Sequence, residues 1–335
     1  MNNSAKLKNT FNNKQILITG GLGFIGSNLA IRLVQLGAKI TLIDAMIPEY
    51  GGNIYNIESI KDKVTVNFAD VRDVHIMNYI VRDKDYIFHL ASQVSHVKSL
   101  TDPYPDIDIN IKGTAVLLEA CKKNNTNAVI IRAGTRGQYG NAKLLPVNEE
   151  APTNPKGIYE ISLLTAEKMM QVYSDIHKLK CVMLRLTNIY GPRSQMKSPD
   201  FGVVNWFIRL ALDKQTIKVF GNGKIKRDFL YIDDCVDAML LTASNKKCYG
   251  EIFNVGHDKP SNFLELTKII CSIVKGSSWE YAPFSKERKA QEPGDFYSDI
   301  TKINSYTGWK PHSGLQDGLQ NTIKYYKQHR SKYWK

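Results

Sequence analysis

A glycine-rich segment near the start of the chain has the residue pattern with the clearest chemical use. The segment TGGLGFIG, residues 19–26, directly follows the apolar run QILIT and opens an amphipathic stretch typical of a helix. Glycines at this spacing permit a tight turn, a close approach of the backbone to a ligand, and close packing of helix and strand. Because free N–H groups at a helix start favour a pyrophosphate, the segment predicts a dinucleotide-binding turn. The residues predicted to bind the cofactor here are Gly20, Gly23, Phe24, Ile25 and Gly26.

An aspartate at the end of the next apolar run indicates which dinucleotide would bind. Asp44 closes the run KITLID, eighteen residues after Gly26. A carboxylate at this place accepts hydrogen bonds from both ribose hydroxyls and repels a 2′-phosphate, which favours NAD over NADP. The alternative is an ordinary turn aspartate, which the placement at the strand end makes the weaker explanation.

A second aspartate follows the third apolar run, in the segment FADVRD. We predict that Asp70 and Val71 also contact the cofactor, with Asp70 near the adenine. Asp70 could equally be the N-cap of a helix predicted over 73–82, because aspartate is a preferred cap residue. The sequence leaves both roles open.

A regular alternation of strands and helices in the first half of the chain would position these residues. The apolar runs are continuous in β-branched and aliphatic residues, which is typical of parallel strands buried on both faces. Their order predicts an α/β fold built on a doubly wound parallel (Rossmann) sheet. Strands are predicted at 15–19, 39–44, 64–69, 85–90, 128–132 and 181–185, with helices that include 24–37, 106–124 and 159–178.

After about residue 190 the pattern becomes less regular. We predict an NAD-binding domain over 1–190 and a smaller α/β substrate-binding domain over 191–335, with segments from 219–257 crossing back to the main sheet. A substrate cleft is then expected between the two parts, at the carboxyl ends of the strands. The later elements predicted are helices at 202–213, 262–275 and 313–328 and strands at 217–220 and 252–255.

The composition is that of an ordinary soluble protein and excludes several classes. The chain has 335 residues, of which 43% are hydrophobic, and a formal net charge of +13. Its lysines are scattered rather than gathered with aromatic residues, so no nucleic-acid partner is predicted. The five cysteines are widely spaced without a C-x-x-C pair, which indicates neither disulfides nor a metal site. With a polar N-terminus and no apolar run of spanning length, we expect a cytoplasmic protein without a membrane partner.

Taken together, these segments resemble the extended short-chain dehydrogenase/reductase family, which comprises nucleotide-sugar epimerases and dehydratases. TGGLGFIG looks like the family's T-G-x-x-G-F-I-G, and HLASQVSH (89–96) is similar to the segment that lines the nicotinamide. RLTNIYGPR (185–193) and VFGNGKIKRDFLYIDDCVDA (219–238) are similar to its later motifs. The resemblance implies a tightly held NAD that is reduced and reoxidised within one catalytic cycle. It places Leu90, Ala91 and Gln93 at the nicotinamide.

The resemblance also assigns the chemistry to two hydroxyl groups. Tyr159 matches the family tyrosine that takes the proton of the sugar hydroxyl and lies against the cofactor. Thr135, counted back from Tyr139, matches the residue that hydrogen-bonds the reacting sugar oxygen. A threonine directly after a strand can alternatively cap the following turn.

The family's lysine, four residues after the tyrosine, is Leu163 in this chain. A free tyrosine has a pKa of about 10, and in the family the lysine helps to lower it. Lys168 lies about 180° around the helix from Tyr159, and Lys156 would reach the site only if its loop folded back. Three interpretations stay open: an active epimerase with a modified acid/base site, activity that relies on another residue, and a catalytically silent protein that binds NAD or a nucleotide sugar.

The reaction type follows from the two residues after Thr135. Dehydratases of the family carry an Asp-Glu pair there, whereas this chain has Arg136 and Gly137. Without those carboxylates 4,6-dehydration loses its acid/base pair, which favours a UDP-sugar 4-epimerase acting through a transient keto intermediate. A 2-epimerase, a decarboxylase or an atypical dehydratase is the alternative.

The nucleoside-diphosphate sugar is expected to contact Asn188, Val204, Arg227 and Arg288, which match the family's substrate motifs or lie nearest to them. Arg136 could also face a substrate phosphate or carboxylate, although a solvated charge or a pair with Glu149 or Glu150 is preferred here. Uridine is chosen as the base from family frequency alone. The family further implies a homodimer that packs segments 106–124 and 159–178.

Two histidines near the expected nicotinamide, His89 and His96, receive no catalytic role. A lone histidine is usually structural, and no carboxylate partner is visible near either of them in the sequence.

Overall fold

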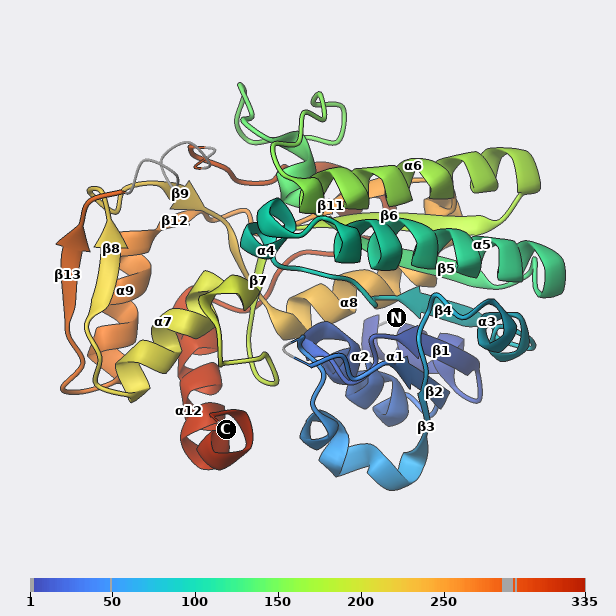
Figure 1. Ribbon diagram of the computed structural model, residues 1–335, viewed down its shortest axis with the longest axis horizontal. Coiled ribbons are helices and arrows are strands. Elements are labelled where there is room, and N and C mark those ends of the chain that lie inside the picture. The colour runs from blue at the N-terminus through green and yellow to red at the C-terminus, as the bar shows by residue number, and fades with distance from the viewer. Residues whose placement is uncertain (1–2, 49, 285–291, 293, 335) are drawn as a thin grey trace.

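The centre of the protein is one parallel sheet, as seen in a computed structural model that describes residues 3–48, 50–284, 292 and 294–334 (Figure 1). Its seven strands lie in the order β11-β6-β5-β4-β1-β2-β3, and every neighbouring pair is parallel. The strands are β1 (Gln15–Thr19), β2 (Lys39–Asp44), β3 (Val64–Phe68), β4 (Tyr86–His89), β5 (Val129–Thr135), β6 (Lys180–Leu186) and β11 (Ile252–Val255). The predicted α/β, doubly wound fold class is therefore confirmed.

Helices cover both faces of this sheet, which explains why its strands are apolar without alternation. Ile16, Leu17 and Ile18 of β1 are all fully buried, although neighbouring side chains point to opposite faces. The helices that pack on one another beside the sheet are α3 (Val74–Ile80), α5 (Gly113–Asn124) and α6 (Ile158–His177) in one group and α2 (Phe24–Gln35) and α8 (Ile232–Ala243) in another. No helix in the described ranges is long and apolar enough to cross a membrane.

The strand order reverses at β1, which pairs with β2 on one side and with β4 on the other. Chain connections leave this point in opposite directions, so a crevice opens at the carboxyl ends of β1 and β4. The two strand ends are joined there, because the Thr19 hydroxyl lies 2.8 Å from Nδ1 of His89. This switch point is the place where a dinucleotide binds in folds of this kind.

A smaller part, drawn on the left of Figure 1, lies beyond the carboxyl ends of the sheet strands. Its core contains α7 (Val203–Leu212), α9 (Phe263–Ile273), α12 (Leu315–Tyr333) and the parallel pair β8 (Ile217–Phe220) and β13 (Trp279–Ala282). Two further short pairs are β7 (Asn188–Tyr190) with β10 (Phe229–Tyr231) and β9 (Lys226–Arg227) with β12 (Ser261–Asn262). Within the segment 219–257, α8 and β11 return to the main sheet, whereas β8 pairs with β13.

Two helical features differ from the sequence-based expectation. An N-terminal helix, α1 (Asn3–Phe11), was not predicted because only two of its apolar residues anchor it: Leu7 and Phe11 are buried, and the Phe11 ring lies 4.9 Å from that of Tyr86. The helix predicted over 106–124 begins with a π-helical stretch, η2 (Asp106–Lys112), before α5. Shorter segments are η1 (Ile54–Lys63), α4 (His96–Thr101), η3 (Arg136–Tyr139), η4 (Pro199–Phe201), η5 (Lys246–Cys248) and α11 (Thr301–Thr307).

Candidate functional site

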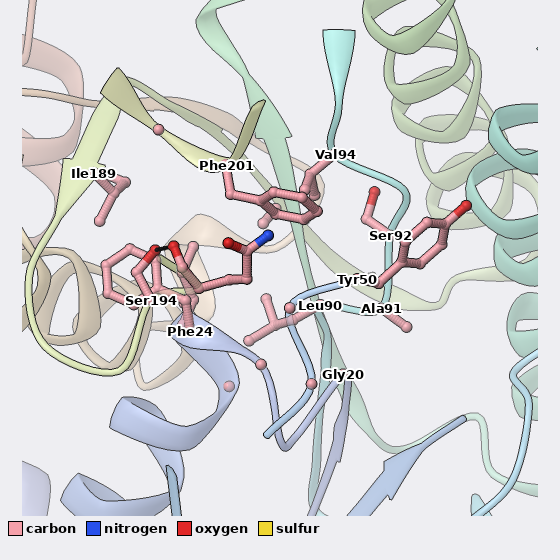
Figure 2. A pocket seen from close by; sticks show the side chains of 18 of the residues that line it. Gly20, Phe24, Tyr50, Leu90, Ala91, Ser92, Val94, Ile189, Ser194 and Phe201 are labelled. Carbon is pink, nitrogen blue, oxygen red and sulfur yellow. Dashed lines mark hydrogen bonds between the residues drawn. The ribbon is translucent and has the colours of Figure 1, made fainter. Parts of the chain in front are cut away.

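A cavity of about 390 Å³ opens at the switch point, between the main sheet and α7. Figure 2 shows Gly20 and Phe24 of the first βα turn facing it together with Leu90, Ala91 and Tyr50, while Ser194 and Phe201 approach from the smaller part. Ten of the eleven predicted cofactor residues other than Tyr159 line it: Gly20, Gly23, Phe24, Ile25, Gly26, Asp44, Asp70, Val71, Leu90 and Ala91. The cavity also reaches Tyr159 and Thr135.

The first βα turn is shaped to receive an anion. Gly20 has φ +67°, and a Cβ on Gly26 would stand 2.2 Å from the carbonyl oxygen of Gly20, so neither position tolerates a side chain. No side chain caps the start of α2 at Gly23, and this leaves the first N–H groups of the helix available to a pyrophosphate. The residues at this turn therefore fit the dinucleotide that the sequence predicts.

The Asp44 carboxylate is held toward the cavity by the backbone on either side. Its Oδ2 accepts a hydrogen bond from Leu22 N at 3.0 Å, and its Oδ1 accepts one from Met46 N at 2.9 Å. Burial raises the pKa of this carboxyl group, whereas the two backbone hydrogen bonds lower it. Each oxygen keeps a lone pair for a hydroxyl donor, which is what binding a ribose diol requires.

Asp70 lines the cavity and does not cap the following helix. Asp73 is the N-cap of α3 instead, with its carboxylate accepting from His75 N at 2.9 Å and Ile76 N at 3.1 Å. Asp70 forms an ion pair with Arg72 (Nη2–Oδ2 2.7 Å), and this interaction lowers the pKa of Asp70. The alternative of Asp70 as a helix cap is therefore wrong.

The segment after β4 presents backbone rather than amide side chains to the cavity. The N–H groups of Leu90 and Ala91 donate to the Thr19 hydroxyl at 3.1 and 3.0 Å, which fixes this stretch against the first strand. Gln93 is 2% exposed, and its Nε2 donates to Asp106 at 2.6 Å in a buried network. Gln93 does not line the cavity, because its side chain is hydrogen-bonded to Asp106 in the protein interior.

Tyr159 and Thr135 meet at the cavity wall. Thr135 is the last residue of β5 and the N-cap of η3, where its hydroxyl accepts from Gly137 N at 3.2 Å. The same side chain lies beside the phenol of Tyr159, which stands in the first turn of α6, and both residues line the cavity. The cap role and the site role of Thr135 are thus compatible, and the two hydroxyls are presented together to a ligand.

The surroundings of Tyr159 disfavour its anionic form. Burial raises the pKa of the phenol well above its ordinary value, and the charge of Glu160 raises it further. The nearby Thr135 hydroxyl and the charge of Arg132 lower the pKa of the phenol. Leu163 is 3% exposed and lines the cavity as an apolar residue. A base at position 159 therefore needs a positive charge from outside α6.

Neither lysine considered as a replacement for Leu163 reaches the site. Lys168 is exposed on α6 and its Nζ donates to Gln171 at 2.9 Å. Lys156 is exposed in the loop before α6 and does not line the cavity.

An ion pair beside Tyr159 was missed from the sequence. His96 Nδ1 lies 2.7 Å from Glu160 Oε1, and this hydrogen bond raises the pKa of His96. The second oxygen of Glu160 is buried without a hydrogen-bond partner. No carboxylate partner was visible near His96 in the sequence, because this partner lies 64 residues away. His89 is fully buried between the Thr19 and Thr114 hydroxyls, so it is structural.

The predicted substrate residues are divided between the cavity and its surroundings. Asn188 and Val204 line the cavity, and the Nδ2 of Asn188 is buried without a hydrogen-bond partner. Arg227 is 2% exposed and forms an ion pair with Glu292. Arg288 lies outside the described residues.

The Arg136 guanidinium packs on an aromatic ring and does not pair with a carboxylate. Its guanidinium lies 5.2 Å from the centroid of the Phe296 ring. No ion pair joins it to Glu149 or Glu150, although all of these residues are described; Glu149 instead accepts from Asn254 N at 2.7 Å. Burial lowers the pKa of Arg136 to about 10, and the nearby charge of Arg227 lowers it as well. Two close guanidinium groups favour an anion between them.

Comparisons with known proteins show which chains this one is similar to. The UDP-glucose 4-epimerase of Mycolicibacterium smegmatis is 31% identical over 93% of this chain and 98% of its own length. The crystal structure of UDP-glucose 4-epimerase from Thermotoga maritima with UDP-glucose has a TM-score of 0.84 and 30% identity, covering 94% of this chain and 99% of that one. The dTDP-glucose 4,6-dehydratase of Bacillus anthracis in complex with NAD has a TM-score of 0.82 and 26% identity, covering 96% and 98%.

The family model described as GDP-mannose 4,6 dehydratase matches residues 17–322, which is nearly the whole chain. Relatives of similar identity are named as epimerases and as a decarboxylase, so the family comprises several reactions on nucleotide sugars. The chain belongs to this family, the extended short-chain dehydrogenase/reductase enzymes that act as nucleotide-sugar epimerases and dehydratases.

Proposed function

We propose that the protein is an NAD-dependent UDP-sugar 4-epimerase that acts through a transient keto intermediate. The observation that carries the proposal is the meeting of the Tyr159 phenol and the Thr135 hydroxyl on the wall of a cavity that also contains the glycine turn and Asp44. A dinucleotide held by the turn and by Asp44 and a sugar hydroxyl held by Tyr159 would share one space. This is the arrangement that hydride transfer requires.

In this reaction Tyr159 would move the proton of the sugar hydroxyl, and Thr135 would hold the oxygen of that hydroxyl. When bound at the glycine turn and Asp44, NAD⁺ would supply the acceptor for the hydride of the sugar carbon. Tyr159 takes the proton of the C4 hydroxyl as a general base, while Thr135 hydrogen-bonds the same oxygen and keeps it in reach. After the sugar turns to present its other face, the hydride would return to C4 and the proton would return from Tyr159 to the same oxygen, which gives the opposite epimer. No further acid is needed for this sequence.

The two positions after Thr135 support epimerisation over elimination. Arg136 packs on Phe296 and Gly137 has no side chain, so this segment offers no carboxylate to protonate a leaving hydroxyl. One observation favours a dehydratase as second candidate: a Cβ on Gly137 would stand 2.5 Å from the Glu160 side chain, which places a buried carboxylate against that segment. Glu160 does not line the cavity with Tyr159, however, and epimerisation is therefore preferred.

A panel of UDP-, GDP-, CDP- and dTDP-sugars tests the proposal. Addition of the correct sugar to protein loaded with NAD should raise the absorbance band of the reduced nicotinamide, and chromatography should show the 4-epimer. A 4-keto-6-deoxy product would support the dehydratase instead. Tight binding of a sugar nucleotide without any absorbance change or product would identify a catalytically silent binding protein.

The preference for NAD depends on the charge of Asp44. Asp44→Asn keeps the shape of the side chain but weakens the hydrogen bonds to the ribose diol. Since a hydrogen bond to a charged group contributes about 1.5–3 kcal/mol, NAD affinity should fall about 10- to 100-fold, whereas NADP affinity should fall less or rise. Calorimetric titration with both cofactors measures this, and an unchanged ratio of the two affinities would remove Asp44 from the ribose site.

The free amide of Asn188 is proposed to hold the substrate rather than the reacting carbon. Asn188→Ala should raise the KM for the nucleotide sugar about two- to tenfold, because a typical hydrogen bond contributes about 0.5–1.5 kcal/mol. The value of kcat should change much less, because the lost hydrogen bond stabilises the bound substrate and the transition state equally. Steady-state kinetics separates the two, and a fall in kcat at constant KM would contradict this role.

A homodimer is proposed through the outer surfaces of η2, α5 and α6. Ile107 is 45% exposed, and Val172 and Ile176 of α6 are 49% and 68% exposed. Apolar side chains gathered on neighbouring helices are typical of a protein–protein contact. The three elements that carry these side chains are neighbours, because α6 packs on both η2 and α5.

A further inference from the structure

The end of helix α12 is joined to the cofactor side of the molecule through one buried asparagine. Tyr333, the last residue of α12, is 2% exposed and donates its hydroxyl to Oδ1 of Asn56 at 2.7 Å. Asn56 is 1% exposed and belongs to η1, the segment that follows β2 along the chain. The two residues are 277 positions apart, so this contact connects the smaller part with the part that carries the glycine turn.

The amide nitrogen of Asn56 is bonded to two segments that form the cavity wall. It donates to the carbonyl oxygen of Leu22 in the glycine turn at 2.9 Å and to that of Arg193 at 3.1 Å. The N–H of Leu22 donates in turn to Asp44, which lines the cavity. Ser194, directly after Arg193, lines the cavity as well (Figure 2). One buried side chain therefore fixes the glycine turn relative to the loop that approaches it from the smaller part.

A second tyrosine of α12 holds the same loop. Tyr326 is fully buried, and its hydroxyl donates to the carbonyl oxygen of Ser194 at 2.9 Å. Its ring packs edge to face on that of Tyr333, with centroids 5.2 Å apart. The Tyr333 hydroxyl also lies 2.6 Å from that of Tyr325, which can donate to it while Tyr333 donates to Asn56. The aromatic cluster at the end of α12 thus directs two hydroxyl groups toward the cavity wall.

The hydrogen bonds of the Asn56 amide depend on one another. Both N–H groups are used on the carbonyl oxygens of Leu22 and Arg193, and the amide oxygen accepts from Tyr333. Without the Tyr333 hydroxyl the buried amide oxygen would lose this donor, which is unfavourable in the protein interior. The amide would then have to turn or admit water, and either change weakens its hold on the two carbonyl groups.

We propose that Asn56 and Tyr333 are positioning residues of the cofactor site, which hold the glycine turn and the loop 191–195 together and thereby retain bound NAD. Asn56 acts on the turn through Leu22, and Tyr333 acts through Asn56. The proposal goes beyond the proposed function, because it concerns how long NAD stays bound and does not depend on which nucleotide sugar reacts.

The dissociation rate of NAD tests this role. Protein loaded with radiolabelled NAD is mixed with an excess of unlabelled NAD, and the loss of label is followed over time. Tyr333→Phe keeps the ring but removes the donor, so the dissociation rate should rise about 5- to 100-fold. Asn56→Asp keeps the shape but turns a carboxylate oxygen toward the carbonyl groups of Leu22 and Arg193, so it should raise the rate at least as much.

A matched control lies at the same end of α12. Arg330 pairs with Asp213 of the smaller part, and its side chain is 53% exposed. Arg330→Met removes a contact of α12 without touching the glycine turn or the loop 191–195. It should leave the dissociation rate of NAD within about twofold of the unchanged protein, since exposed ion pairs contribute little.

Two further measurements separate positioning from a general loss of stability. In Tyr333→Phe without NAD, hydrogen exchange should become faster in segments 19–26 and 191–195 and stay unchanged in α9. Adding Tyr333→Phe to Asn56→Ala should raise the NAD dissociation rate no further, because the two residues act in series. Circular dichroism and thermal unfolding verify that each variant is folded, and Asn56→Ser serves if Asn56→Ala does not fold.

A folded Tyr333→Phe protein that releases NAD at the original rate would overturn the proposal. An equal effect of Arg330→Met, or independent effects of the two changes in the double variant, would overturn it as well. None of these measurements needs a sugar nucleotide. Failure of the UDP-sugar panel is therefore distinguishable from failure of the role of Asn56 and Tyr333.

Discussion

Replacing Tyr159 with phenylalanine is expected to lower the turnover of the nucleotide sugar by about 10²- to 10⁴-fold, the usual contribution of a general base. The phenol lines the cavity beside Thr135 and is the group proposed to accept the proton of the sugar hydroxyl. The phenyl ring keeps the packing of the first turn of α6, so NAD affinity should change little. Stopped-flow absorbance of the reduced nicotinamide and steady-state kcat measure the loss.

A matched control lies on the same helix. Tyr173 of α6 has its hydroxyl on Glu119, outside the cavity, so Tyr173→Phe should keep turnover near that of the unchanged protein. If Tyr159→Phe retained turnover as well as Tyr173→Phe does, another group would have to move the proton. The hypothesis of activity through a different residue would then be preferred.

The second large effect is expected from Gly26→Ala. The new Cβ would stand 2.2 Å from the Gly20 carbonyl oxygen, so the helix start must move away from the glycine turn. Overpacking of this kind costs about 1–3 kcal/mol, and the displaced N–H groups no longer meet the pyrophosphate. NAD affinity should therefore fall at least about ten- to hundredfold, as measured by calorimetric titration.

Gly314→Ala provides the comparison for this substitution. A Cβ at Gly314 meets only the Asp317 carboxylate, at 3.5 Å, and Gly314 does not line the cavity. It should leave NAD affinity unchanged. Equal NAD binding by Gly26→Ala would show that the cofactor does not approach this turn.

The parts of the fold that follow from short-range patterns were predictable from the sequence. Continuous apolar runs located β1 and β2 to the residue, and the glycine turn between them lies at the switch point. The glycine spacing and the acid at the end of β2 each depend on a few neighbouring residues. Such patterns can be recognised without knowledge of the tertiary structure.

Residues whose surroundings come from distant segments were not predictable. Glu160 follows Tyr159 directly, yet its partner His96 lies on another helix. Gln93 matches a cofactor motif, but the buried carboxylate of Asp106 withdraws its side chain from the cavity. In each case the outcome depends on which polar groups the fold brings together, and spacing along the chain does not encode that.

Tertiary structure also decides whether an aspartate caps a helix or faces the cavity. Asp70 and Asp73 are equally good caps by residue type, and the position at which α3 begins decides between them. Arg136 was expected to be a solvated charge or to pair with a glutamate nearby in sequence, whereas it packs on the ring of Phe296, far along the chain. The local sequence offers both partners, and tertiary packing selects one.

The central claim is that bound NAD⁺ would take a hydride from one sugar carbon while Tyr159 takes the proton of its hydroxyl beside Thr135, and that the hydride returns to the same carbon. UDP-glucose carrying deuterium at C4 tests it directly, with the product analysed by NMR. The account predicts UDP-galactose that keeps deuterium at C4 in ordinary water, together with loss of the reaction in Tyr159→Phe. Deuterium found at C6, deuterium lost to solvent, or product formed equally well by Tyr159→Phe would contradict it.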